Sequence, residues 1–361
     1  MLGAIQSILV LVLTSYLSVV NSLAYAIESI LPAEQTPTEI AEKAAEETDE
    51  ISTLPSSYER GGLLPDILIK NAAYQKAAVI EGTGNAETAS SLTDALVNIY
   101  CTFTTDTYVK TTTGTGFFVS DSGVILTNAH VAMFLLLEDI EEAGKSKCVV
   151  RTGSPAEPTY LADLLYISPA WINRNAAVIS ASVPKGTGER DYALLYVTST
   201  LDSTPTPAHF PFLSVNSDLV SQSLTDATVT IGGYPASKTA AGLSVTQATS
   251  STSIAEIYTF GTKYGDLLAL RGSPVGEHGI SGGPVINEDN EAIGLISTKG
   301  DQEELGTGSL NAITLSYINR TLIEETGFGF ASSIAGDLHF RAQIFRETLR
   351  PFLGQILSDE I

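Results

Sequence analysis

From about Leu92 onward the chain breaks into short runs of β-branched and aromatic residues, and this pattern constrains the fold more than any other feature. Clusters of turn-forming residues separate the runs, which therefore have the length of strands and not of helices. One cluster, Ser120 to Gly123, is a short hairpin connection in which Gly123 supplies the left-handed backbone position. The runs are VNIYCTF, TGFFV, VILTN, CVVRT, DYALLYV, ATVTIGGY and AIGLIST. The pattern predicts an all-β domain.

The composition is that of a folded, acidic protein. Of the 361 residues, 43% are hydrophobic and 17% are charged, which argues against a disordered chain. Asp and Glu number 41 against 19 Lys and Arg, so the formal net charge is −22. A surface of this sign repels phosphate backbones and anionic membrane surfaces. We therefore expect no nucleic acid among the partners.

The first 26 residues contain an apolar run from Ile8 to Val20 and end at Ala24-Tyr25-Ala26, a small-x-small pattern that signal peptidase cleaves. No Lys or Arg precedes the run, and hydroxyl side chains interrupt it. We interpret residues 1–26 as a signal peptide or an uncleaved membrane anchor, with a buried cytosolic helix as the third alternative. The first two imply export to the periplasm, to the exterior, or to an outward-facing membrane position.

Two helical segments are expected before the β-rich region. EIAEKAAEETDEI is a polar helix, and Leu64 to Val79 is a more apolar one suited to packing on the domain. GTGNAETASS, residues 82–91, is a linker. We interpret residues 27–91 as an acidic helical spacer, and a regulatory pro-segment is the alternative.

Helical spacing returns at the end of the chain. SYINRTLIEE, which follows Leu315, is one helix, and a second runs from about His339 to Leu357. The apolar residues that recur in the second are Ile344, Phe345, Leu349, Phe352 and Leu353. We expect residues 326–361 to form a C-terminal helical extension that packs on the core.

Three segments carry the residue types of nucleophilic catalysis: TNAHV with His130, DYALLYV with Asp191 and HGISGGPV with Ser281. A serine hydroxyl needs an adjacent base to react at neutral pH, and that base needs an acid to orient it. The glycines around Ser281 let the amides of Gly279 and Ser281 converge into an oxyanion hole. The order His, Asp, Ser differs from that of subtilisins and of α/β-hydrolases. The sequence therefore predicts a His130, Asp191, Ser281 triad.

The blocks GTGFFVSDSGVILTNAHV, DYALLYV and HGISGGPV resemble the catalytic blocks of trypsin-like serine proteases, nearest the HtrA/Deg style, over roughly residues 92–325. The resemblance implies two six-stranded antiparallel β-barrels, about 92–200 and about 210–325, with the active site between them. It implies a serine endopeptidase that needs no cofactor and cleaves proteins or peptides through an acyl-enzyme. His130 would be general base and then general acid, Asp191 would orient it, and Ser281 would attack the scissile carbonyl.

Some positions depart from the digestive members of that family. Ile280 stands where those enzymes carry an Asp that pairs with a freed N-terminus, so activation by that clipping is not expected. Val275 lies at the position that resembles the floor of the primary specificity pocket, which implies a small or aliphatic P1 residue. The strand that pairs with the substrate backbone would be Ser297, Thr298 and Lys299. The chain after Glu325 is too short for a PDZ domain.

The only cysteines are Cys101 and Cys148, which can form one bridge at most and no metal cluster. The resemblance places them on neighbouring strands of the first barrel and so implies a disulfide. The histidines are dispersed and HExxH is missing, so we expect no metal. Val149 to Arg190, which holds the only tryptophan, Trp171, is interpreted as an enlarged surface loop, with a substrate-contacting role as the alternative.

Two rival functions fit part of the sequence. GISGG also matches the G-x-S-x-G of esterases, with Ser281, Asp301 and His339 as the triad, but Gly282-Gly283-Pro284 disfavours the helix that such a serine precedes. The non-enzyme alternative is a catalytically silent binding or scaffold protein on a protease fold. A lost triad residue would be its signature, and none is lost. The natural substrate and the oligomeric state have no signal in the sequence.

Overall fold

The computed structural model describes most of the chain from Ser52 onward. The described residues are 52–54, 66–77, 91–107, 109–138, 140, 144–181, 187–236, 244–261, 263–299 and 305–361. The interpretation of residues 1–26 and the helix expected in EIAEKAAEETDEI lie outside them. Within them, no helix has the length and hydrophobicity that crossing a membrane requires.

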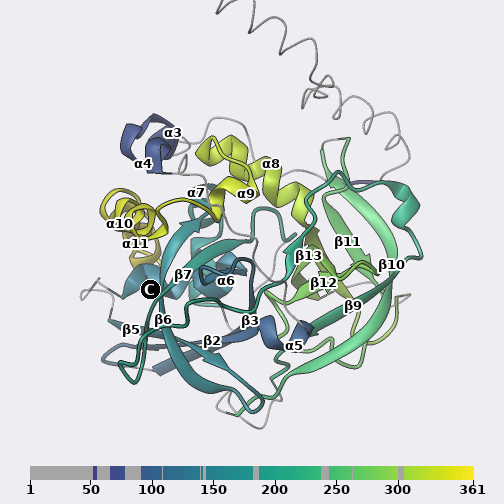
Figure 1. Ribbon diagram of the computed structural model, residues 1–361, viewed down its shortest axis with the longest axis horizontal. Coiled ribbons are helices and arrows are strands. Elements are labelled where there is room, and N and C mark those ends of the chain that lie inside the picture. Colours follow the sequence, from purple (N-terminus) through teal and green to yellow (C-terminus); the bar gives the residue numbers. More distant parts are fainter. Residues whose placement is uncertain are drawn as a thin grey trace, which may run out of the picture. The chain divides into compact units, whose positions relative to one another are not determined.

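The first barrel is built from the apolar runs between residues 96 and 200 (Figure 1). Its six strands close in the order β2-β3-β4-β7-β6-β5, and every neighbouring pair is antiparallel. The strands are β2 (Leu96–Thr104), β3 (Val109–Phe118), β4 (Val124–Thr127), β5 (Lys145–Thr152), β6 (Glu157–Ile167) and β7 (Ala193–Thr200).

The second barrel closes because β9 pairs with both β10 and β12. The ring runs β9-β10-β11-β14-β13-β12, and its neighbours are again antiparallel. Its strands are β9 (Thr228–Gly233), β10 (Ala248–Phe260), β11 (Leu267–Leu270), β12 (Pro284–Ile286), β13 (Glu291–Lys299) and β14 (Leu310–Thr314). Short strands β1 (Ser52–Leu54) and β8 (Ser214–Val215) add in parallel to β10 and β13. The predicted pair of six-stranded antiparallel barrels is confirmed.

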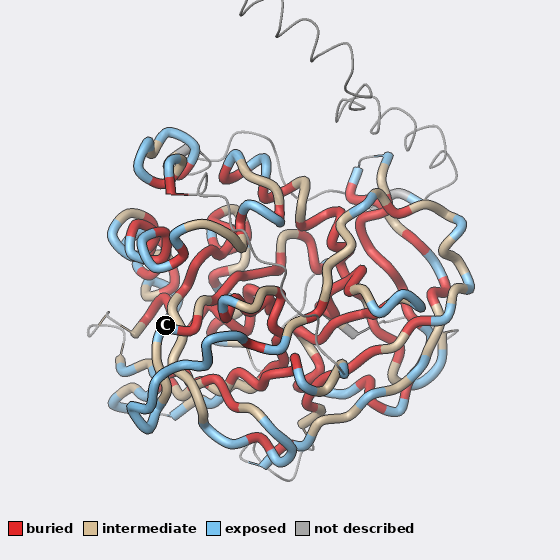
Figure 2. Tube along the Cα trace, in the orientation of Figure 1, coloured by how far each residue is buried: buried red, intermediate tan, exposed pale blue. Residues whose placement is uncertain are grey.

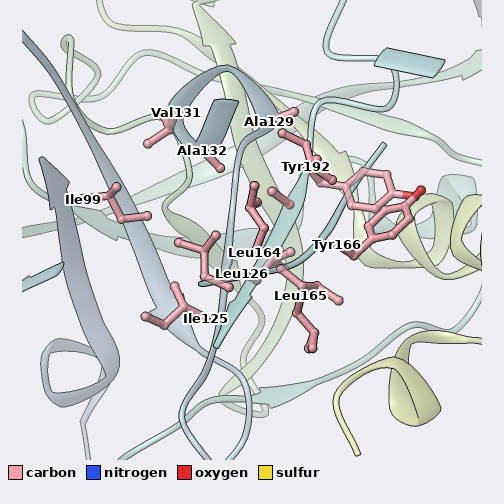
Figure 3. Packing of buried hydrophobic residues seen from close by; sticks show 14 of the residues in the cluster. Ile99, Ile125, Leu126, Ala129, Val131, Ala132, Leu164, Leu165, Tyr166 and Tyr192 are labelled. Atoms are coloured by element: carbon pink, nitrogen blue, oxygen red, sulfur yellow. The ribbon is translucent and has the colours of Figure 1, made fainter. Parts of the chain in front are cut away.

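The interiors of the barrels are apolar, and the buried stretches follow the strands (Figure 2). In the first barrel, Leu126 of β4 has no solvent exposure and belongs to the same buried cluster as Ile99 of β2 and Leu164 of β6 (Figure 3). Burying such side chains is the main favourable term in folding, at roughly 1.5 to 3 kcal/mol for each large aliphatic group. The packed interiors therefore hold the strands of both barrels in fixed positions.

Residues 149–190 are not the enlarged surface loop expected from the sequence. They supply part of β5, all of β6, helix α7 (Pro169–Asn175) and the 3₁₀ turn η3 (Ala176–Ile179). Ser168 caps α7 by accepting a hydrogen bond from the Trp171 amide, and Pro169 begins the helix, where no amide hydrogen is needed. Trp171 is 5% exposed and belongs to the core.

The C-terminal helices are α8 (Leu315–Thr326), α9 (Phe330–Ser333), α10 (Leu338–Thr348) and α11 (Arg350–Ser358). The single helix expected from His339 to Leu357 is wrong, because it breaks at Leu349. Pro351 lacks an amide hydrogen, and its ring clashes with the preceding turn of a continuous helix. Phe352 was expected in the core and is 59% exposed, whereas Phe345 and Leu353 are fully buried.

The helix expected over Leu64 to Val79 is likewise two shorter ones, α3 (Asp66–Lys70) and α4 (Ala72–Ala77). Asn71 interrupts them, because its side-chain oxygen accepts hydrogen bonds from the first amides of α4. On α4, Tyr74 is fully buried beside the Phe328 ring, and its hydroxyl accepts a hydrogen bond from Arg341 at 3.2 Å. Helix α4 is therefore docked on the C-terminal helices.

Replacing Tyr74 by Ala removes a fully buried ring, so we expect the free energy of unfolding of the whole chain to fall by about 3 kcal/mol. Urea denaturation followed by circular dichroism measures this change. Ile69→Ala on α3, where the side chain is 37% exposed, is the control and should change stability by less than about 0.5 kcal/mol. Equally small effects of both substitutions would contradict the docking of α4.

Candidate active site

His130 lies on the first turn of α6 (Ala129–Ala132), which follows β4 after Asn128. Helix α6 continues into the 3₁₀ turn η1 (Met133–Leu137), which is buried throughout. Before the helix, the Asn128 side-chain amide donates to the Asp191 carbonyl at 2.8 Å. The segment with the imidazole is thus held between the barrel core and the chain around Asp191.

Asp191 is 4% exposed, and its two carboxylate oxygens accept three hydrogen bonds. The His130 main-chain N–H donates to Oδ1 at 2.9 Å, and the His130 Nδ1 lies 2.7 Å from Oδ2. The Ser297 hydroxyl donates to Oδ2 at 2.7 Å. With the Nδ1 proton directed at a carboxylate, the other ring nitrogen of His130, Nε2, is left as a proton acceptor.

Ser281 lies on the loop between β11 and β12. At two positions, the backbone of this loop has a conformation that favours glycine. Gly279 and Gly282 have φ angles of +92° and +88°. A Cβ on Gly282 would lie 1.9 Å from the Thr115 carbonyl oxygen, and one on Gly279 would lie 2.5 Å from that of Tyr234. The glycines around the serine are therefore required by packing as well as by conformation.

The first barrel holds this loop through Thr115 on β3. The Thr115 hydroxyl donates to the Gly279 carbonyl at 2.7 Å, and its main-chain N–H donates to the Ser281 carbonyl at 2.8 Å. Within the described residues, the N–H groups of Gly279 and Ser281 have no backbone acceptor. An oxyanion hole needs amides that are free to bind a substrate oxygen, and these two are candidates for that role. Nothing in the sequence marked Thr115, because its contacts form only when the barrels meet.

The Ser281 hydroxyl donates to the Ser297 carbonyl at 3.3 Å, and no hydrogen bond joins it to His130 among the described residues. Ser297 therefore touches two of the predicted triad residues, with its hydroxyl on Asp191 and its carbonyl on Ser281. The resemblance placed Ser297 only on the substrate-pairing strand. The contact of its side chain with Asp191 is a role that the sequence did not reveal.

Val275 is 8% exposed and belongs to the apolar cluster of the second barrel, with Ile280, Ile296 and Leu310. Beside it, two backbone segments touch, because a Cβ on Gly276 would lie 2.0 Å from the Gly308 carbonyl oxygen.

Thr298 and Lys299 both lie on β13, where the Thr298 hydroxyl accepts a hydrogen bond from Asn311 at 3.5 Å. The placement of the Lys299 side chain is outside the described part of the structure. The role of these residues in substrate binding stays a prediction.

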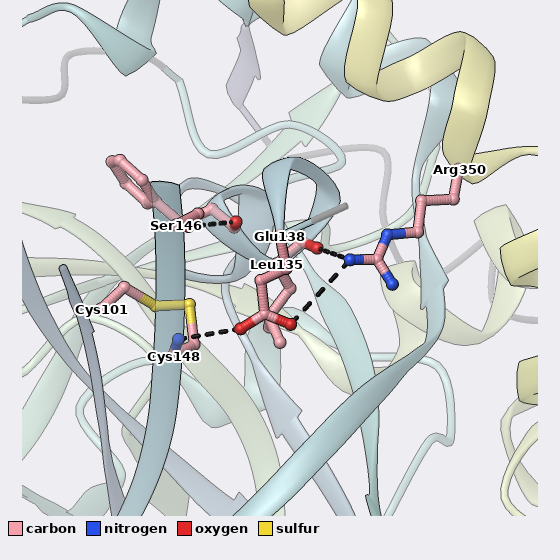
Figure 4. Close-up of a disulfide and its surroundings, with 7 residues drawn as sticks. Cys101, Leu135, Glu138, Ser146, Cys148 and Arg350 are labelled. Carbon is pink, nitrogen blue, oxygen red and sulfur yellow. Dashed lines mark hydrogen bonds and ion pairs between the residues drawn. A yellow bond between two sulfur atoms is a disulfide. The ribbon is translucent and has the colours of Figure 1, made fainter. Parts of the chain in front are cut away.

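Cys101 on β2 and Cys148 on β5 face each other and form a disulfide (Figure 4). The Glu138 carboxylate accepts from the Cys148 N–H at 2.8 Å and lies 3.9 Å from the Arg350 guanidinium of α11. Arg350 also donates to the Leu135 carbonyl at 2.7 Å. The disulfide, α11 and the segment that follows the His130 helix thus form one connected region.

The chain after Ser281 is not that of an esterase nucleophile. Only Gly282 and Gly283 separate the serine from β12, which begins at Pro284, whereas an esterase serine precedes a helix. Of the other two residues of the alternative esterase triad, His339 is exposed on α10 and Asp301 lies outside the described residues. No group of three or more His, Cys, Asp or Glu within the described residues is arranged to hold a metal ion.

The model of the trypsin-like peptidase domain matches residues 114–295, just over half of the chain, and this stretch includes His130, Asp191 and Ser281. Among solved structures, the Rv3671c protease from M. tuberculosis in its active form aligns with a TM-score of 0.41 at 17% sequence identity. The alignment covers 82% of this chain and 93% of that one. No curated protein matches the sequence. From the family match, the chain belongs to the trypsin-like peptidase domain family.

Proposed function

We propose that this protein is a serine endopeptidase with His130, Asp191 and Ser281 as its catalytic triad. The observation that carries the proposal is the buried Asp191 carboxylate, which accepts hydrogen bonds from both the ring and the main chain of His130. Such a pair is the orienting acid and base that an activated serine requires. The amides of Gly279 and Ser281, which have no backbone acceptor in the described part of the chain, would add the site for the developing oxyanion.

In this mechanism Ser281 Oγ rotates from the Ser297 carbonyl to His130 and attacks the scissile carbonyl as Nε2 takes its proton. Asp191 stabilises the imidazolium that forms, and the amides of Gly279 and Ser281 bind the oxyanion. The imidazolium then protonates the leaving amine, which leaves an acyl group on Ser281. Water, deprotonated by His130, hydrolyses this ester and restores the free enzyme.

One observation favours the catalytically silent alternative, in which the fold only binds its partners. The Ser281 hydroxyl is directed at the Ser297 carbonyl and not at His130. Hydrogen bonds of catalytic residues often tighten only when a substrate is bound, which is why the endopeptidase remains the conclusion. Chemical reactivity of Ser281 separates the two functions.

We propose that the protein acts outside the cytoplasm, and the disulfide between Cys101 and Cys148 supports this, because such bonds persist in oxidising compartments. The apolar residues 1–26 would direct export, as a cleaved signal or as an anchor.

The proposal predicts that a fluorophosphonate probe attaches covalently to Ser281 of the purified chain, as read by mass spectrometry of the intact protein and its peptides. Ser281→Ala removes the acceptor and His130→Ala removes the base, so neither variant should form the adduct. Circular dichroism confirms that each variant is folded. A folded wild-type chain without adduct would contradict the endopeptidase and favour the silent alternative.

Ser297→Ala removes a hydroxyl that donates to the Asp191 carboxylate, and a hydrogen bond to a charged group is worth about 1.5 to 3 kcal/mol. We expect the rate of Ser281 labelling to fall by about tenfold or more. Ser251→Ala, at an exposed position on β10, is the matched control and should label at the wild-type rate. A Ser297→Ala rate equal to that of the control would show that this hydroxyl has no part in the chemistry.

Val275 predicts the P1 residue. It lies at the position that resembles the floor of the primary specificity pocket and belongs to an apolar cluster, so we expect a small or aliphatic P1 side chain and not a long basic one. In a peptide library with randomised P1, we expect kcat/KM for Ala or Val to exceed that for Lys or Arg by at least about tenfold. Preferred cleavage after Lys or Arg would contradict this assignment of the pocket.

A further inference from the structure

Side chains of helix α8 form hydrogen bonds with the residues immediately before and after Asp191. The Arg190 guanidinium donates to Glu325 and, at 2.7 Å, to Glu324. The Tyr192 hydroxyl lies 2.8 Å from that of Thr321. The side chains before and after Asp191 thus reach α8, whereas the Asp191 carboxylate bonds to His130. Because α8 follows β14 directly, this link runs from the second barrel to the first.

The turn that leads into Asp191 has an unfavourable backbone conformation, which contacts with neighbouring residues must stabilise. The Asp191 N–H donates to the Gly188 carbonyl at 3.1 Å, and Arg190 inside this turn has a φ angle of +59°. The left-handed region is unfavourable for a residue with a Cβ, so the turn persists only where its surroundings impose it. A contact made by the Arg190 side chain is the most direct way to impose it.

The contact between Arg190 and Glu325 is buried, and other side chains also donate hydrogen bonds to the Glu325 carboxylate. The Glu325 side chain is 6% exposed and that of Arg190 is 14% exposed. Tyr166 and Ser168 of the first barrel also donate to the Glu325 carboxylate. The ring of Tyr166 stacks on that of Tyr192 with centroids 5.9 Å apart, as Figure 3 shows from close by. Burial raises the pKa of Glu325, and Arg190 opposes that rise by stabilising the carboxylate.

We propose that α8 positions the catalytic acid: Glu325 through Arg190, and Thr321 through Tyr192, hold the turn that aims the Asp191 carboxylate at His130. Arg190 and Glu325 are positioning residues, since they act through Asp191. The inference rests on the proposed function for its kinetic consequence. Its structural consequence, the bond between His130 and Asp191, is measurable whether or not Ser281 reacts.

The test compares Glu325→Gln with the wild-type chain by two readouts. The first is the downfield proton resonance of the His130 Nδ1–H, which reports its hydrogen bond to Asp191. The second is the rate of Ser281 labelling by the fluorophosphonate probe. We expect the resonance to be lost to exchange with water and the rate to fall by about 10- to 100-fold, as expected for a misplaced catalytic group. Glu347→Gln, on α10, makes the same chemical change at an exposed site and should alter neither.

A second variant covers the case in which Glu325→Gln fails to fold because it leaves Arg190 buried without its charged partner. Arg190→Met combined with Glu325→Gln removes both charges and keeps the volume of the pair, a change that folded proteins tolerate. Loss of the resonance and slow labelling in this folded variant would support the proposal. A wild-type resonance and labelling rate in a folded variant of either kind would overturn it. Failure of the wild-type chain itself to label would instead count against the proposed function, because the resonance alone decides the positioning.

Discussion

The rest of the site depends on the buried carboxylate of Asp191. A carboxylate removed from water is stable only when hydrogen-bond donors surround it, and here the other residues of the site supply those donors. Its oxygens bond to the imidazole and the main chain of His130 and to the Ser297 hydroxyl. His130 belongs to the first barrel and Ser297 to a strand of the second. The same carboxylate therefore holds the His130 imidazole and links one barrel to the other.

A second contact between the barrels holds the loop that carries Ser281. The Thr115 hydroxyl and main-chain N–H, on the first barrel, donate hydrogen bonds to the carbonyls of Gly279 and Ser281 and so hold the loop that carries Ser281. The close approach of this loop leaves no room for a Cβ on Gly282. The arrangement of the proposed catalytic residues thus depends on contacts between the two barrels.

The barrels were predictable because strands buried on one face or both appear as short apolar runs with turn residues between them. The sequence predicts the triad from three segments that carry His, Asp and Ser in a diagnostic order, and the catalytic role of these residues stays a proposal. The hydroxyl of Ser297, the support from Thr115 and the pairing of Arg190 with Glu325 were not predictable, since each joins residues far apart in sequence and no local pattern marks them. The helix breaks at Asn71 and Leu349 were missed for a different reason. There, a capping side chain and Pro351 overrode an otherwise continuous apolar spacing.

The most direct test of the central claim is the rate at which Asp191→Asn reacts with the fluorophosphonate probe near neutral pH. The amide keeps the shape of the side chain but no longer stabilises the imidazolium, and it favours the wrong tautomer of His130. We predict a folded protein whose Ser281 labels about 10³- to 10⁴-fold more slowly than that of the wild type. Labelling of the folded variant at the wild-type rate would contradict the assignment of Asp191 as the acid of the triad.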